Sequence, residues 1–204
     1  MQQYCYESEV SMRKGLCYTS VIYVVCGSIL CCAEAHACVA TLFAAAEQDG
    51  RVGLARKSKP VDVRPARPGE IVVTILAGEK ETQSPPAKAG DMVVRNRCRE
   101  TGNEEILVGA AKFDQRYEGP TGTAGADGWQ PYRPRGVEML YVIVRDADGS
   151  FDFEAPWGES MIARPGDAIV RDPQDVKDTY RNEAVAFACT YEILRPASPA
   201  GPRR

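Results

Sequence analysis

The 204-residue sequence predicts an α+β fold, mainly β, in which a small unit of strands, a Gly-Asp corner and a short helix is built twice. The composition, 44% hydrophobic and 26% charged, is that of an ordinary globular protein. Short β-branched runs separated by glycine and proline turns are typical of strands. An internal repeat supplies the third observation, because a repeat identifies the unit of folding. A barrel-like arrangement is one form that such a unit can take.

The repeat pairs Gly90–Arg95 with Gly166–Arg171, and Phe113–Glu118 with Phe187–Glu192. Each copy has Gly-Asp followed by apolar residues and an arginine, and later Phe-x-x-x-Tyr-Glu. The glycine precedes the phenylalanine by 23 positions in the first copy (113 − 90) and by 21 in the second (187 − 166). In chain order, we expect an apolar, Cys-rich N-terminal segment (1–53), a first unit (54–118), a Gly/Pro-rich linker (119–135), a second unit (136–194) and a disordered tail (195–204).

The first unit has three short runs rich in β-branched residues. These runs predict strands at Glu70–Leu76, Met92–Val94 and Glu105–Val108. Ala110–Tyr117 contains no helix breaker, and it places Phe113 and Tyr117 four positions apart. Because residues four apart share one face of a helix, this segment predicts a short helix with an aromatic face.

The second unit repeats this order with more elements. Apolar runs predict strands at Val137–Val144, Phe151–Glu154, Met161–Ala163, Ala168–Val170 and Thr190–Leu194. Asp148-Gly149 is a hairpin signal between the first two of these strands. Gly158-Glu159 predicts a turn that answers Gly78-Glu79 in the first unit, and Ala184–Ala188 predicts a helical turn.

Turn chemistry explains the Gly-Asp corners. Glycine permits the positive φ of a tight turn, and the aspartate can accept backbone N–H groups two residues on. A functional alternative is an enzyme in which carboxylates divide the work of acid and base. Its candidate residues are Asp91, Asp167, Glu105 and Glu159. Their spacing selects no pair, so we expect no catalytic residue among them and lean against an enzyme.

The ends of the two Phe-x-x-x-Tyr-Glu motifs are the candidate binding residues. A duplicated unit can bring two equivalent faces together in one groove. We therefore expect a pocket between the copies, lined by Tyr117, Glu118, Tyr191 and Glu192. Trp129 lies in the linker and is a fifth candidate, which either covers a core edge or stacks on a ligand.

Charge and histidine content exclude several function classes. The formal net charge is −3, whereas a nucleic-acid surface needs a clear basic excess. The short basic run of Arg51, Arg56, Lys57 and Lys59 is interpreted as a solvated linker face, with a phosphate contact as the alternative. His36 is the one histidine, so a multi-histidine metal site is impossible within one chain. We expect no metal and no cofactor.

The N-terminal segment is open to three interpretations. Arg13-Lys14 precede an apolar run, Leu16–Cys32, and small residues follow it, which is typical of a secretory signal or anchor. The abrupt change in composition near Leu54 instead favours dispensable upstream sequence, and a genuine Cys-rich helix is the third interpretation. A cytoplasmic location is favoured unless residues 1–53 are genuine, in which case export or membrane anchoring follows. Cys98 and Cys189 are expected to be free buried thiols, with the alternative that they are the remaining pair if the mature protein is exported.

Two family resemblances follow from these motifs. Gly158, Pro165-Gly166-Asp167 and Pro173 resemble the second cupin motif, but its histidines are absent, which leaves a metal-free, cupin-like fold. The PGDYG family of small bacterial and phage proteins resembles the chain over residues 56–118, and a degenerate second copy covers residues 136–192. The matching motifs are Arg56–Val63, Gly90–Val94, Gly102–Glu105 and Phe113–Glu118.

The PGDYG resemblance implies no activity, and it has two departures in each copy. In the first copy, Ala89 stands where that family has proline, and Met92 stands where it has an aromatic residue. The second copy lacks the basic start and has Ala168 in place of the aromatic residue. The sequence therefore predicts a non-catalytic binding or accessory module whose ligand it does not identify. The partner is an unknown small molecule or protein, and an unpaired strand edge could support a homo-oligomer.

Overall fold

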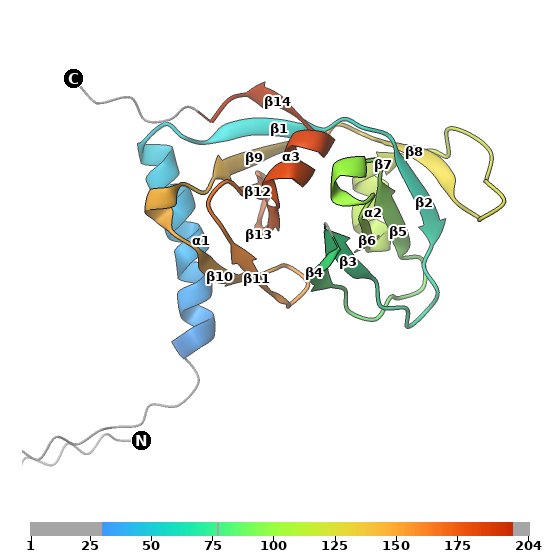
Figure 1. The fold of residues 1–204 in the computed structure, drawn as a ribbon, viewed down its shortest axis with the longest axis horizontal. Helices are drawn as coiled ribbons and strands as arrows, with labels where there is room; N and C mark the ends of the chain where they lie inside the picture. Colours follow the sequence, from blue (N-terminus) through green and yellow to red (C-terminus); the bar gives the residue numbers. More distant parts are fainter. Residues whose placement is uncertain (1–29, 77, 198–204) are drawn as a thin grey trace, which may run out of the picture.

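The computed structural model describes residues 30–76 and 78–197, with side chains from Val39 onward. This part of the chain is α+β and mainly β, as the sequence predicts. Two five-stranded antiparallel sheets lie side by side, and each is accompanied by a two-stranded hairpin (Figure 1). Both sheets are open at their edges, so the barrel-like and cupin-like expectations stay unconfirmed.

The first sheet has the strand order β6-β5-β2-β8-β7. Its strands are β2 (Val61–Pro65), β5 (Met92–Asn96), β6 (Glu105–Val108), β7 (Tyr117–Glu118) and β8 (Gln130–Pro134). The hairpin of β3 (Val73–Leu76) and β4 (Glu79–Gln83) joins β2 to β5, and the 3-10 turn η1 (Arg99–Thr101) and helix α2 (Ala110–Arg116) precede and follow β6.

The second sheet has the strand order β13-β12-β9-β1-β14. Its strands are β1 (Gly53–Lys57), β9 (Glu138–Ile143), β12 (Ala168–Asp172), β13 (Asp175–Asn182) and β14 (Tyr191–Arg195). The 3-10 turn η2 (Asp146–Asp148) and the hairpin of β10 (Phe151–Glu154) and β11 (Ser160–Ala163) follow β9, and helix α3 (Ala184–Thr190) lies between β13 and β14.

Two strands cross between the halves of the chain. β1 precedes β2 in sequence but pairs with β9 in the second sheet, where Ala55 lies opposite Met139. β8 precedes β9 in sequence but pairs with β2 in the first sheet, where Val61 lies opposite Tyr132. The first half of the chain, β1 to β7, therefore contributes β1 to the second sheet. The second half, β8 to β14, contributes β8 to the first sheet. The expectation that residues 119–135 form only a linker is wrong, because the strand β8 lies within them.

The Gly-Asp corners adopt the expected backbone conformation, with φ of +89° at Gly90 and +95° at Gly166. The hydrogen bonds differ from those expected, because each carboxylate reaches back three residues. Asp91 accepts from the amide of Lys88 (2.7 Å), and Asp167 accepts from the amide of Arg164 (2.8 Å). The reason is that the same residue pairs close the turn through the backbone, with the aspartate amide donating to the earlier carbonyl.

The Phe-x-x-x-Tyr pairs are core anchors in both halves, as predicted. Phe113 and Tyr117 stack with ring centroids 5.2 Å apart, and Phe187 and Tyr191 stack at 4.9 Å. The first pair packs with valines of β2 and β5, such as Val63. The second packs with residues of β1, β9 and β12. Both pairs therefore fasten a short helix to its sheet.

Helix α1 (Leu30–Gln48) packs on the second sheet and the β10–β11 hairpin. Phe43 is 1% exposed and Ala46 is fully buried. The guanidinium of Arg171, on β12, lies 3.7 Å from the centre of the Phe43 ring. The side chains of this helix from Val39 onward complete a core, which favours a genuine element over dispensable sequence for residues 39–48.

The signal or anchor interpretation concerns mainly residues 1–29, which lie outside the described part of the chain, as does the side chain of His36. Among the helices of residues 30–76 and 78–197, none has the length and apolar character that a membrane span requires. The expected disordered tail falls largely on residues 198–204, which also lie outside the description. Before them, the amide of Ala197 donates to the hydroxyl of Tyr141 (2.9 Å).

Several local expectations change in the structure. Asp148-Gly149 does not form a hairpin, because β9 pairs with β1 and β12 while β10 pairs with β11. The predicted strand at Glu70–Leu76 begins only at Val73. The sequence does not predict the strands β1, β2, β4, β8 and β13, because charged residues or prolines interrupt their apolar pattern. It does not predict the two-residue strand β7 either, since the predicted helix continues to Tyr117.

Candidate functional site

A cavity of about 430 Å³ lies between the two sheets. Both halves of the chain line it: β6 and α2 from the first, and β9, β13 and α3 from the second. The two hairpins add further walls, with Leu76 from one and Met161 from the other. Pockets for small ligands typically measure about 300–1,000 Å³ and are mostly apolar with a few polar groups. The cavity has the size and the mixed lining of such a site.

Tyr117 and Tyr191 both line this cavity, as expected of a pocket between the halves. The hydroxyl groups of Tyr191 and Tyr180 lie 3.1 Å apart, and Arg116 donates to Tyr180 (3.1 Å). Burial, together with Tyr180, raises the pKa of Tyr191 well above its usual value. Tyr191 therefore stays a neutral hydroxyl at physiological pH.

Arg116, on α2, links the first half to the second through carboxylates. Its guanidinium lies 2.5 Å from a carboxylate oxygen of Asp178, and the Lys112 ammonium lies 2.7 Å from the same residue. Burial opposes the charge of Arg116, but Tyr180 and Asp178 outweigh it, so the pKa of the guanidinium is raised. Asp172 lies 3.6 Å from Arg116 and 3.8 Å from Lys112, so two carboxylates neutralise these two cations in the cavity wall.

Arg181 is shared by two carboxylates. It pairs with Asp167 at the second Gly-Asp corner (2.6 Å) and with Glu81 of β4 (2.7 Å). The Glu81 side chain is 12% exposed, and it lines the cavity. Burial raises the pKa of Glu81 to about 7 despite Arg181, and Glu104, Asp167 and Glu183 add to the increase. One guanidinium cannot neutralise two buried carboxylates, so Glu81 can hold its proton near neutral pH.

Lys57, at the end of β1, is a cation of the cavity wall that pairs with no carboxylate within the described residues. Its ammonium donates to the amide oxygen of Asn96 (3.2 Å) and lies 6.0 Å from the ring centre of Tyr191. The amide nitrogen of Asn96 donates in turn to Glu104 (2.8 Å). An ammonium carries three donors, so Lys57 has donors left for a ligand.

Two further polar groups among the described residues of the cavity wall have unsatisfied donors. Tyr180 accepts from Arg116, and a single hydrogen bond joins Tyr180 to Tyr191. One of the two hydroxyl hydrogens therefore has no acceptor among the described residues. The amide nitrogen of Asn182, which also lines the cavity, is buried and has no hydrogen-bond partner among the described residues. A bound group that accepts hydrogen bonds would satisfy these donors.

Glu118 and Glu192 are not among the described residues that line the cavity. Glu118 pairs with Arg133 of β8 (2.5 Å), and Glu192 pairs with Arg56 of β1 (2.9 Å). Glu118 thus joins β7 to β8, and Glu192 joins β14 to β1. The structure brings together only the two tyrosines of the four residues expected in one groove.

Trp129 covers an edge of the first sheet. It packs against a buried cluster that includes Val72 and Val93, and the guanidinium of Arg95 lies 4.2 Å from its ring centre. Arg64 lies against the same ring at 5.2 Å. Of the two roles expected for Trp129, the structure places it in the first, next to a core edge.

None of the four carboxylates considered for catalysis is among the described residues of the cavity wall. Asp91 and Asp167 hold the corners. Glu159 accepts from the Thr82 hydroxyl and the Gln83 amide (2.6 Å each), which joins the β11 end of one hairpin to β4 of the other. Glu105 lies on β6, where its carbonyl accepts from a threonine of β3. The cavity carboxylates are instead Glu81, Glu104, Asp178 and Glu183.

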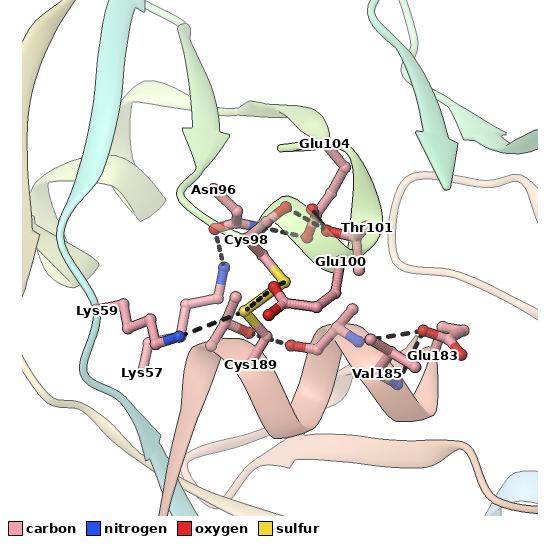
Figure 2. The surroundings of a disulfide bond; sticks show 12 residues. Lys57, Lys59, Asn96, Cys98, Glu100, Thr101, Glu104, Glu183, Val185 and Cys189 are labelled. Carbon is pink, nitrogen blue, oxygen red and sulfur yellow. Dashed lines mark hydrogen bonds between the residues drawn. A yellow bond between two sulfur atoms is a disulfide. The ribbon is translucent and has the colours of Figure 1, made fainter. Parts of the chain in front are cut away.

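Cys98 and Cys189 form a disulfide between the two halves, so the expectation of free thiols is wrong (Figure 2). Their Cα atoms lie 6.0 Å apart, within the usual range for a disulfide. Glu100 lies against both sulfur atoms, and these three residues could together hold a metal ion if the sulfurs were free thiolates. In the bonded form the thiolate ligands are consumed, so the trio does not provide a metal site.

The basic run of Arg51, Arg56, Lys57 and Lys59 contains a cavity residue, Lys57, that its interpretation as a solvated linker face does not predict. Arg51 is 3% exposed, and Lys57 lines the cavity, so neither belongs to a solvated linker face. Alternation along β1 could have indicated this, because residues two apart on a strand share a face. The burial pattern of Gly53–Lys57 begins with such an alternation.

Comparison with protein-family models, curated proteins and solved structures finds no match for this chain. The resemblance to the PGDYG family therefore stays a prediction.

Proposed function

We propose that this protein is a non-catalytic binding module that holds a small, largely apolar anion in the cavity between its two sheets. The observation that carries the proposal is Lys57, an ammonium in the cavity wall whose one hydrogen-bond partner among the described residues is a neutral amide. The unsatisfied donors on Asn182 and on the Tyr180–Tyr191 pair also need a group that accepts hydrogen bonds. A carboxylate meets it, because an ionised carboxyl group only accepts hydrogen bonds.

The apolar part of the ligand follows from the rest of the wall. Leucine, isoleucine, methionine and tryptophan side chains contribute to it, among them Leu76, Ile106, Met139 and Trp157. Burial of an alkyl or aryl body against these side chains stabilises the complex by about 25 cal/mol per Å² of apolar surface. We therefore infer a monoanion with an apolar body as the ligand class.

We further infer that the two halves are copies of one unit. The strand orders β6-β5-β2-β8-β7 and β13-β12-β9-β1-β14 correspond position by position. Each half has a Gly-Asp corner and a Phe-Tyr stack at corresponding places. A ligand cavity between two copies explains why both stacked tyrosines contribute to one wall.

Calorimetric titration with decanoate and with decan-1-ol tests the proposed function. The two probes share an apolar chain and differ in charge. Charged hydrogen bonds contribute about 1.5–3 kcal/mol, so decanoate should bind roughly tenfold or more tightly than the alcohol. Lys57→Met should remove this preference, whereas Lys88→Met, at an exposed lysine outside the cavity wall, should leave it intact.

Val137→Trp supplies the control for location. Val137 lines the cavity and is 37% exposed, so a larger side chain can fill the space without disrupting a core. Binding of both probes should be lost in this variant while the far-UV circular dichroism stays unchanged. Failure of the unsubstituted protein to bind either probe, or equal binding by Val137→Trp, would overturn the proposal.

A further inference from the structure

The Cys98–Cys189 disulfide joins two walls of the cavity. Cys98 lies between Asn96 and Glu104, the two cavity-lining residues that flank η1. Cys189 lies in α3, the helix that begins beside Glu183 and carries Ala186 into the cavity wall. The bond connects positions 91 residues apart, one in each half of the chain. Figure 2 shows the bond between the η1 segment and α3.

The segment around η1 (97–104) also positions the side chain of Asn96, which accepts a hydrogen bond from Lys57. Asn96 binds Lys57 with its amide oxygen and Glu104 with its amide nitrogen. The hydroxyl of Thr101 donates to Glu104, and the amide of Asn103 donates to the carbonyl of Cys98 (2.7 Å). These hydrogen bonds couple the position of Cys98 to the position of the Lys57 ammonium.

The two sulfur atoms differ in access and in charge environment. Cys98 is fully buried, whereas Cys189 is half-buried. The ammonium of Lys59 lies 3.4 Å from the sulfur of Cys189, and Glu100 lies within 3.6 Å of the same sulfur. A neighbouring cation stabilises a thiolate. Cys189 is therefore the sulfur that an external thiol can reach. Glu100 also lies 3.4 Å from the sulfur of Cys98, so Lys59 is the charge that favours a thiolate at Cys189 over one at Cys98.

We propose that the Cys98–Cys189 disulfide is a thiol-exchangeable clamp that holds the cavity in its binding form and that a dithiol opens. This inference rests on the proposed binding function of the cavity. In the oxidised form the bond holds η1 against α3. In the reduced form the two walls are released, and Asn96 loses the support that positions Lys57.

The exchange is a two-electron reduction with a dithiol as the reductant. One thiolate of the dithiol attacks the sulfur of Cys189, a sulfur–sulfur bond forms there, and the electron pair of the broken bond leaves on Cys98, which takes up a proton. The second thiol of the reductant then attacks the reductant sulfur that is bonded to Cys189 in the mixed disulfide. Cys189 leaves as a thiolate beside Lys59, and the dithiol is released as a cyclic disulfide.

Decanoate titration of the full chain before and after dithiothreitol treatment tests the clamp. We expect reduction to weaken decanoate binding at least tenfold and to speed amide hydrogen exchange in residues 97–104 and 184–190. The chain has eight cysteines, so a variant is needed to assign the effect of the reductant to this bond. Cys189→Ser is the matched control: it should bind decanoate weakly from the start, and dithiothreitol should change neither its binding nor its exchange.

Two outcomes separate the clamp from the proposed function. Equal decanoate binding and equal hydrogen exchange in the oxidised and reduced proteins would overturn the clamp and leave the binding function in place. No decanoate binding by the oxidised protein would overturn the binding function and, with it, the clamp as a control of affinity. Peptide mass analysis after brief exposure to glutathione should place the mixed disulfide on Cys189, and its exclusive appearance on Cys98 would contradict the exchange route.

Discussion

The shared guanidinium of Arg181 shows how a single buried cation determines the ionisation of its neighbours. Asp167 engages one nitrogen and Glu81 another. The carboxylates of Glu104 and Glu183 also line the cavity and act on Glu81 in the same direction as its burial. Burial and this acidic surrounding raise the pKa of Glu81 to about 7, whereas the usual value is 4.5. The folded state therefore binds a proton that the unfolded chain releases between these two pH values.

Substitution Glu81→Gln should change the pH dependence of stability. A carboxyl group with a raised pKa stabilises the folded state below its unfolded pKa, and this stability is lost as pH rises through the folded pKa. The unfolding free energy of the natural chain should thus fall by roughly 3 kcal/mol between pH 4.5 and 7 because of Glu81. Glu81→Gln should remove this fall and be the more stable protein at pH 8, as measured by urea denaturation.

Glu79→Gln is the matched control for this prediction, because Glu79 lies two residues earlier on β4 and is exposed. It should follow the natural chain across the whole pH range. A constant stability difference between the natural chain and Glu81→Gln from pH 4.5 to 8 would contradict the raised pKa. In the same range, ionisation of Glu81 should weaken the binding of an anion in the cavity, because like charges repel.

At the scale of elements, α1 contributes to a core rather than preceding the domain. Its buried face is provided by Val39, Leu42, Phe43 and Ala46. These residues pack on β9, β12 and the β10–β11 hairpin, where Val142 and Met161 are also buried. The helix thereby covers a face of the second sheet that would otherwise expose apolar surface.

Phe43→Ala should destabilise the protein by about 3–5 kcal/mol, because it leaves a cavity and removes the ring beneath Arg171. Thermal unfolding followed by circular dichroism measures this loss. Thr41→Ala, at an exposed position of the same helix, should change stability by less than about 0.5 kcal/mol. Equal stability of the two variants would return residues 39–48 to the interpretation of a dispensable segment.

The whole molecule is interlocked by its crossing strands. β1 completes the second sheet and β8 completes the first, so neither sheet can form from one half of the chain alone. Side chains also join the hairpins, since Trp157 donates to Thr82 (3.3 Å) and Glu159 accepts from the same residue. Such sharing of strands should make the halves unfold together.

The two tryptophans offer a test of this cooperativity, because Trp129 packs on the first sheet and Trp157 on the core beneath α1. In Trp157→Phe, fluorescence reports the first sheet, and in Trp129→Phe it reports the core beneath α1 together with the contact of Trp157 with Thr82. Within each variant, the urea midpoint by fluorescence should coincide with that by circular dichroism. Separate midpoints in either variant would show that the halves unfold independently.

Local features of the fold could be predicted where short-range geometry decides them. The positive φ at Gly90 and Gly166, the short helices, and the stacked Phe-Tyr pairs depend on residues within about one turn of each other. The candidate site was predicted in part, because Tyr117 and Tyr191 reach the cavity and their glutamates do not. Neighbouring residues on a strand point to opposite faces, which separates each glutamate from its tyrosine.

The sequence by itself determined a mainly β protein with two Gly-Asp corners and two aromatic anchors, because turn conformation and side-chain periodicity are written in local runs of residues. The tertiary structure alone decided that β1 and β8 cross between sheets, that Lys57 enters the cavity, and that Cys98 meets Cys189. These features depend on strand pairing between distant segments, and a local pattern does not specify which strand is the partner.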